Sequence, residues 1–230
     1  MRRLSDTVFH SPIRFCPFFF FCGLFMLISE IWKQYCLTFL VNDGAFNWWY
    51  FPFQLCSTPM YILLVLPHIK KERLCNACLT FLMSFGLLGG TAVFADTTGL
   101  HYPLHALTIH SYTWHILLIL IGCFAAAARF SGKEENPSFH LPAARSFSDA
   151  ALLYVTFCAA AACINHICSR FGTINMFYIN PKYPMEQVVF CELVPYLGNI
   201  PVIFLYITAT IVGAGILFFF WELLFLRRKS

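Results

Sequence analysis

Cys56 and His115 are the two side chains whose chemistry could together support nucleophilic catalysis. Cys56 lies in PFQLCSTPM, residues 52–60, between two prolines, and His115 lies several turns inside the apolar segment around YTWHILLIL. A thiol needs to lose its proton to attack, and a nearby imidazole can accept that proton and later give it to a leaving group. If the two side chains meet, they could transfer an acyl group, and inside a bilayer a lipid ester is the expected substrate.

Further polar residues are predicted at the same depth as this pair. Thr108, Ser111 and His115 share a helix face, because positions i, i+3 and i+7 are neighbours on a helix. Gln54 lies in the same turn as Cys56. These side chains could line one pocket in the outer half of the membrane.

A third polar group would be needed to orient the imidazole. Asn165 and Asp96 lie near the outer ends of two other apolar segments, and no spacing selects between them. Polar groups inside a bilayer are costly, so each is a hypothesis of function. The alternative stays open for each residue alone, since a buried histidine or asparagine can simply join helices, at roughly 0.6–2 kcal/mol.

Two other patterns have the spacing of metal sites. His101 and His105 are four positions apart on a predicted helix, and Cys75 and Cys78 form a CxxC pair. A zinc or redox site of this kind needs a second pair of ligands nearby, and none is close in sequence. We therefore expect no metal and no cofactor.

The composition places these residues in a membrane protein. The 230-residue chain is 59% hydrophobic and 11% charged, whereas a soluble domain has roughly 25% charged residues. The apolar residues cluster in runs of about 18 or more, long enough to cross a bilayer. We predict an all-α, polytopic helical bundle that forms one membrane domain over residues 1–230, with no nucleic-acid partner.

Six spans are predicted along the chain. They are residues 15–40, 51–68, 75–95, 104–128, 143–168 and 200–226. The first span follows a basic start but is too long for a cleaved signal peptide, and no small-residue cleavage site follows it.

The basic residues predict the orientation of the spans. Of the 15 Lys and Arg residues, all except Lys33, Arg170 and Lys182 fall on one side, Arg129 among them in a polar cytoplasmic loop. The positive-inside rule places this side, with both termini, in the cytoplasm. We expect a multi-pass protein, in the inner or plasma membrane if the chain is bacterial.

The segments that flank the predicted pocket are unusual. The outer loop 169–199 is rich in aromatic residues and prolines, and we expect it to lie on or dip into the outer interface, with Tyr178, Tyr183 and Tyr196 at headgroup depth. Pro52 suits the first turn of the second span, whereas Pro59 is expected to kink it and free the Leu55 carbonyl.

Several motifs resemble those of the YwaF-like integral membrane proteins, whose animal branch is the transmembrane protein 164 group of acyltransferases. PFQLCSTPM is similar to the family's proline–x–x–leucine–cysteine motif, and YTWHILLIL to its intramembrane histidine. INHICSRFGTINMFYINPKYP and LVPYLGN are similar to two further stretches of the family, in the same order over about residues 50–200.

The resemblance implies a helical bundle that transfers acyl chains from a phospholipid to a lysophospholipid. It assigns Cys56 as the acyl-carrying nucleophile and His115 as its partner. The residues that match the third motif, expected to form the pocket, are Asn165, Gly172, Thr173 and Asn175. The chain departs from the family where Met176 and Phe177 replace a tyrosine-methionine pair, and where a tryptophan is missing from LVPYLGN.

Two other classes of function fit the same pattern. A substrate-binding or carrier subunit for a small molecule would also have about six spans and an outer polar pocket, and GLLGG and CFAAAAR provide small-residue seams for helix sliding. A purely structural or regulatory bundle is the third. A carrier would still bind its ligand after loss of the Cys56 thiol, whereas an acyltransferase would lose activity.

Overall fold

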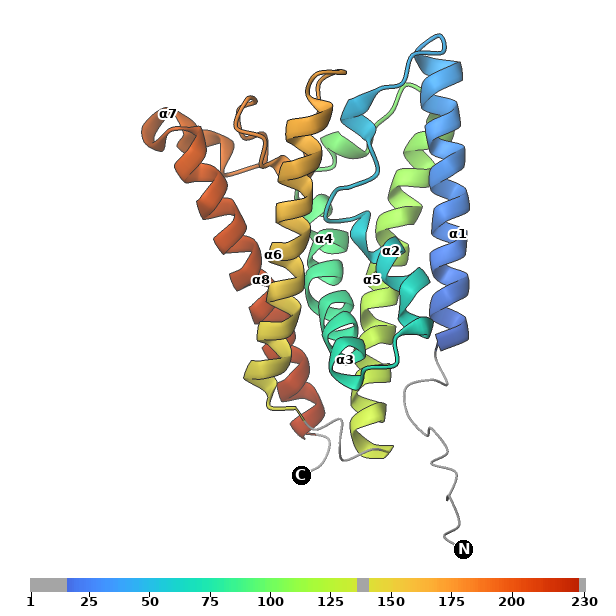
Figure 1. Ribbon diagram of the computed structural model, residues 1–230, viewed down its shortest axis with the longest axis vertical. Coiled ribbons are helices and arrows are strands. Elements are labelled where there is room, and N and C mark those ends of the chain that lie inside the picture. Colours follow the sequence, from blue (N-terminus) through green and yellow to red (C-terminus); the bar gives the residue numbers. More distant parts are fainter. Residues whose placement is uncertain (1–15, 136–140, 228–230) are drawn as a thin grey trace, which may run out of the picture.

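The computed structural model describes residues 16–135 and 141–227, and all the regular elements of this part are helical (Figure 1). The helices are α1 (Cys16–Tyr35), α2 (Thr58–Val65), α3 (Glu72–Phe81), α4 (Leu87–Ala92), α5 (His105–Glu135), α6 (Ala143–Cys168), α7 (Val194–Leu197) and α8 (Asn199–Arg227). A π-helical turn, Cys36–Val41, extends α1, and another, Leu82–Gly86, joins α3 to α4. The prediction of an all-helical bundle is confirmed.

Five helical stretches of the described chain are long and apolar enough to cross a membrane, which is typical of a multi-pass membrane protein. They are Pro17–Val41, Glu72–Ala95, His105–Ser131, Ala143–Cys168 and Asn199–Phe225. Five of the six predicted spans correspond to these stretches, in the same order: 15–40, 75–95, 104–128, 143–168 and 200–226. α1 begins and α8 ends at the same end of the bundle (Figure 1).

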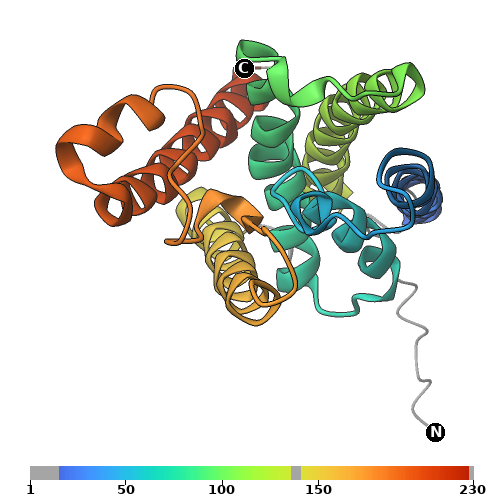
Figure 2. The same cartoon turned by 90° about the horizontal axis from the view of Figure 1, so that it is seen from above.

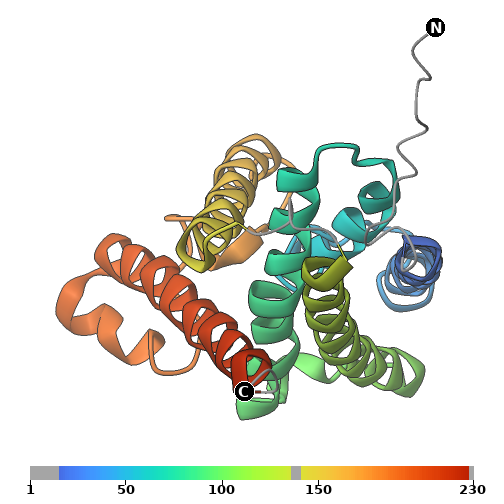
Figure 3. The same cartoon turned by 90° about the horizontal axis from the view of Figure 1, so that it is seen from below.

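The continuous helix formed by α3 and α4 lies at the centre of the bundle. Residues 75–87 are all buried, and this stretch contacts α5, α6 and α8. Seen from either end, α1 and α8 stand on opposite sides of it (Figure 2, Figure 3). α1 packs mainly against α2, which fills the space beside the central helix.

The second predicted span, 51–68, is helical only over Thr58–His68. At 1.5 Å per residue this helix is about 16 Å long, shorter than the roughly 30 Å of a hydrocarbon core. The predicted kink at Pro59 is wrong, because Pro59 lies in the first turn of α2, where it has no hydrogen bond to lose. The Leu55 carbonyl accepts a hydrogen bond from the Thr58 hydroxyl at 2.9 Å.

Arg129 does not lie in a polar loop, as its position between two predicted spans suggested. It is a fully buried residue of α5, and its Nη1 atom lies 2.7 Å from Glu222 Oε1 on α8. Its Nε donates to Asn76 Oδ1 on α3 at 3.0 Å, and the Asn76 amide donates to the Ser146 hydroxyl on α6. The charge is tolerated because acid and amide partners face it from neighbouring helices.

The outer loop folds back into the bundle. Its centre, residues 174–177, is at most 2% exposed, whereas Tyr196 at its far end is 85% exposed. Phe177 and Tyr178 adopt positive φ angles of 57° and 56°, which allow a tight turn at this depth. The centre of the loop is therefore buried inside the molecule.

Candidate active site

The Cys56 thiol and the His115 imidazole lie close enough to interact with each other. Cys56 is partly buried and lies in the turn that precedes α2, whereas His115 is a buried residue of α5. The two residues belong to different segments of the bundle and are brought together by its packing. A thiol beside an imidazole is the combination that a nucleophile and its base require.

The backbone of α5 orients the imidazole. His115 Nδ1 lies 2.7 Å from the carbonyl oxygen of Ser111, one turn earlier. Because a carbonyl only accepts hydrogen bonds, Nδ1 holds the ring proton of the neutral imidazole. Nε2 is then the nitrogen with a lone pair, and it is the one left for the thiol.

Neither Asn165 nor Asp96 is the group that orients His115. Asn165 is engaged with the backbone of Met176. The Asp96 carboxylate accepts a hydrogen bond from the Thr98 N–H, and this bond lowers the pKa of Asp96 below its usual value. The orienting group is the Ser111 carbonyl, so Ser111 acts through its main chain and not through the hydroxyl that the sequence pattern emphasised.

Trp114 fixes the main chain of the nucleophile. Its indole Nε1 donates to the carbonyl oxygen of Cys56 at 3.1 Å. Two consecutive residues of α5 therefore contact Cys56, Trp114 at the carbonyl and His115 at the thiol. The sequence pattern predicts no role for Trp114, although its place beside His115 in YTWHILLIL was the available signal.

Two adjacent glycines, Gly89 and Gly90, allow α4 to lie close to the turn that contains Cys56 and to α5. A Cβ atom at Gly89 would lie 3.4 Å from Leu55 Cγ and 3.7 Å from the Cys56 nitrogen. A Cβ atom at Gly90 would lie 3.2 Å from the carbonyl oxygen of His115. The GLLGG motif thus packs α4 against both partners of the pair.

Gln54 and Asn165 hold the buried turn of the outer loop. The Gln54 amide donates to the Asn175 carbonyl at 2.9 Å and accepts from the Phe177 N–H at 2.7 Å. The Asn165 amide makes the same double contact with the carbonyl and N–H of Met176, at 3.0 and 2.7 Å. Both predicted pocket residues therefore bind backbone, and they position the loop beside Cys56.

The remaining predicted pocket residues have other contacts. Thr108 Oγ1 accepts a hydrogen bond from the Tyr102 N–H at the start of α5. Gly172 lies under Trp48, whose Cδ1 would be 2.8 Å from a Cβ atom there. Thr173 is exposed, and Asn175 is buried, with its side-chain oxygen accepting from the Asn180 N–H.

Tyr178 brings a phenol to the neighbourhood of the thiol. It lies within electrostatic range of Cys56, and burial raises its pKa to about 12, so the hydroxyl stays protonated. This phenol belongs to the left-handed turn formed by Phe177 and Tyr178.

A buried ion pair on α1 faces the same region. Lys33 Nζ lies 2.8 Å from Glu30 Oε1, and Glu30 is 3% exposed. Gln34 donates to the same carboxylate at 2.8 Å and to the Tyr50 carbonyl at 2.7 Å. Both charges lie within electrostatic range of Cys56. Charged residues inside an apolar predicted span were the signal that could have identified them.

In residues 16–135 and 141–227 there is no group of three or more His, Cys, Asp or Glu side chains that could hold a metal ion. His101 Nδ1 contacts the Thr97 carbonyl at 2.8 Å, and Cys75 and Cys78 are buried in the core.

Comparisons with models of protein families, with curated proteins and with solved structures gave no match to this chain.

Proposed function

We propose that this chain is a membrane-embedded acyltransferase that moves an acyl group from a phospholipid to a lysophospholipid. The observation that supports it best is the proximity of the Cys56 thiol to an imidazole whose other nitrogen is held by the Ser111 carbonyl. The similarity of the motifs around Cys56 and His115 to those of YwaF-like proteins agrees with this proposal.

In the first half of the reaction, Nε2 of His115 accepts the thiol proton while the Cys56 sulfur attacks the ester carbonyl of the phospholipid. The bond between the carbonyl carbon and the glycerol oxygen then breaks, and the imidazolium gives its proton to that oxygen. A lysophospholipid leaves, and the acyl group is held on Cys56 as a thioester.

In the second half, a different lysophospholipid occupies the site. Nε2 of His115 accepts the proton of its free hydroxyl, and the oxygen attacks the thioester carbonyl. The carbon–sulfur bond breaks, and the imidazolium returns the proton to the sulfur. The segments packed around the thiol limit the access of water, which would otherwise hydrolyse the thioester.

The test is transfer activity of the purified chain in lipid nanodiscs. A phospholipid with an isotope-labelled acyl chain and an unlabelled lysophospholipid are supplied, and labelled product is measured by mass spectrometry. Cys56→Ala and His115→Gln should each abolish transfer, whereas Cys22→Ser, a control at another partly buried cysteine, should keep it. Full transfer by Cys56→Ala would overturn the proposal.

The alternative function is that of a small-molecule carrier or substrate-binding subunit without catalysis. Its predicted helix-sliding seam, GLLGG, is occupied by close packing of Gly89 and Gly90 against the Cys56 turn and α5. Equal ligand binding by the wild-type chain and by Cys56→Ala, with no acyl transfer by either, would favour the carrier.

A further inference from the structure

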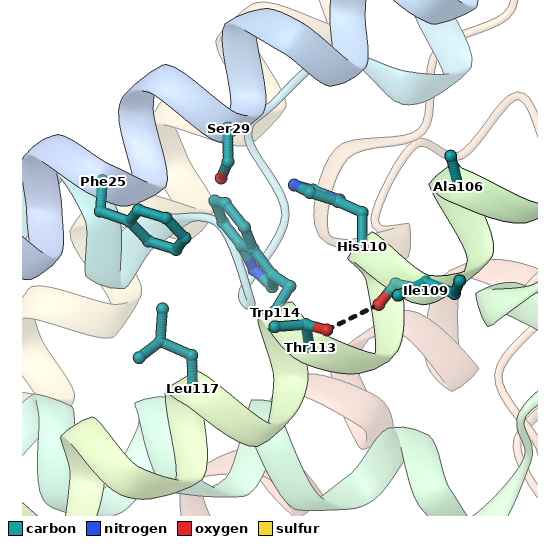
Figure 4. Close-up of a pocket in the computed structure, with 8 residues that line it drawn as sticks. All are labelled: Phe25, Ser29, Ala106, Ile109, His110, Thr113, Trp114 and Leu117. Atoms are coloured by element: carbon teal, nitrogen blue, oxygen red, sulfur yellow. Dashed lines mark hydrogen bonds between the residues drawn. The ribbon is translucent and has the colours of Figure 1, made fainter.

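A groove of about 230 Å³ lies between α1 and α5. Phe25 and Ser29 form its wall on α1, and His110, Trp114 and Leu117 are among the residues that form its wall on α5 (Figure 4). Both helices are among the stretches long and apolar enough to span a membrane. A groove that opens sideways between two such helices faces hydrocarbon, so an alkyl chain is the ligand that its walls suit.

His110 adds one polar atom to this apolar groove. Its ring lies between Trp32 and Trp114, with ring centroids 5.6 Å from each, and points toward Ser29 (Figure 4). Its Nε2 atom is buried and has no hydrogen-bond partner among the residues that the structure describes. A buried polar atom without a partner costs roughly 1–3 kcal/mol. A ligand with a hydrogen-bonding group beside its alkyl chain would remove that cost.

The groove and the candidate active site share a wall. Trp114, which lines the groove, donates its indole N–H to the carbonyl of Cys56. His110 lies within electrostatic range of His115 and of Lys33. Lys33 is near the outer end of α1, and its ammonium has three N–H donors, one of them near Glu30.

We propose that the α1–α5 groove binds one acyl chain of the phospholipid substrate, and that His110 Nε2 forms a hydrogen bond with the glycerol backbone next to that chain. This inference rests on the proposed acyl transfer for the identity of the lipid. The groove positions the lipid beside Cys56 and admits it from the side of the bilayer.

Photo-crosslinking tests the groove directly. The probe is phosphatidylcholine with a diazirine on one acyl chain, added to the full chain as its Cys56→Ala variant in nanodiscs, so that no turnover occurs. Labelled residues are then located by peptide mass spectrometry. We expect labels on the groove walls around Ser29 and Leu117. Labelling confined to other lipid-facing surfaces would overturn the proposal.

Two variants give the labelling a matched control. Ala106 lines the groove, and Ala127 is exposed on α5 without lining it. Ala106→Phe should narrow the groove and lower labelling about tenfold, or 1.4 kcal/mol, whereas Ala127→Phe should leave it unchanged. Equal labelling in both would contradict the proposal.

His110→Phe keeps an aromatic ring and removes the nitrogens. It should lower groove labelling about fivefold through the lost hydrogen bond, and this readout remains if Ala106→Phe does not fold. Unchanged labelling would show that His110 does not contact the lipid.

The same reagents separate this inference from the proposed function. If acyl transfer persists unchanged in Ala106→Phe and His110→Phe and the groove is not labelled, the proposal for the groove is overturned and the proposal for Cys56 and His115 stands. If the groove is labelled but the wild-type chain never transfers an acyl group, the proposed catalysis is overturned and lipid binding by the groove stands.

Discussion

Trp114 donates its indole N–H to the carbonyl oxygen of Cys56 at 3.1 Å, while the imidazole of the next residue, His115, lies beside the thiol of the same cysteine. One turn of α5 therefore holds both the main chain and the side chain of Cys56. This arrangement fixes the direction in which the sulfur faces the imidazole, and it can be tested separately from the imidazole itself.

Trp114→Phe should lower kcat about tenfold with a smaller change in KM. The ring and most of the bulk remain, so the loss reflects the hydrogen bond that positions Cys56, worth about 1 kcal/mol in itself, together with the less favourable geometry of attack. Steady-state transfer kinetics measure both constants. An unchanged kcat would mean that the indole bond does not position the nucleophile.

Gly90→Ala should destabilise the bundle and impair transfer. The new Cβ atom would lie 3.0 Å from Leu118 Cβ and 3.2 Å from the His115 carbonyl oxygen, so α5 must shift. Overpacking of this kind costs typically 1–3 kcal/mol. Gly99→Ala is the control, because nothing lies within 4 Å of its added Cβ atom. Thermal unfolding in detergent compares the two, and equal melting temperatures would argue against a tight contact at Gly90.

Asn165→Leu should loosen the outer loop. It leaves the buried Met176 N–H without a partner, at about 1–3 kcal/mol, and removes one of the two hydrogen bonds that the Met176 carbonyl accepts, the other coming from the Ile179 N–H. Limited proteolysis within residues 169–199 should therefore become faster. Thr173→Ala, at an exposed position of the same loop, should leave the cleavage rate as it is. Equal rates in the two variants would show that Asn165 does not hold the turn.

Arg129→Met should be among the most destabilising single changes, by about 3–5 kcal/mol, because it removes a buried guanidinium that lies 2.7 Å from the Glu222 carboxylate and 3.0 Å from Asn76 Oδ1. Arg73→Met breaks a pair with Asp149 in which Arg73 is largely exposed, so its effect should be much smaller. Chemical or thermal unfolding in detergent compares them. Similar losses of stability in both variants would contradict the structural role of Arg129.

The sequence predicts the helical class and the limits of α6 well, because long apolar runs between polar segments leave few alternatives in a bilayer. It also nominates Cys56 and His115, since a thiol and an imidazole are conspicuous among apolar residues. The count of spans is less predictable. Residues 51–57 are largely apolar and extend the hydrophobic run of the second predicted span. The structure shows that helix α2 begins only at Thr58, with Pro59 in its first turn.

The groups that position the site are hidden from sequence reasoning for a physical reason. The Ser111 carbonyl and the Cys56 carbonyl are main-chain atoms, which every residue has, so no residue type marks them. The burial of Arg129 is hidden from sequence reasoning for a similar reason, because its acid partner, Glu222, lies far along the chain. Predicting it would require knowing that α5 and α8 meet.

The central claim is that Cys56 receives an acyl group, and intact-protein mass spectrometry tests it most directly. The His115→Gln variant and the wild-type chain are incubated in nanodiscs with phospholipid and without added lysophospholipid, and each mass is recorded before and after neutral hydroxylamine. The account predicts that the wild-type chain gains one acyl mass, located on Cys56 and removed by hydroxylamine, and that His115→Gln gains none. A wild-type chain that transfers acyl groups in the full assay but never forms a thioester on Cys56 would contradict it.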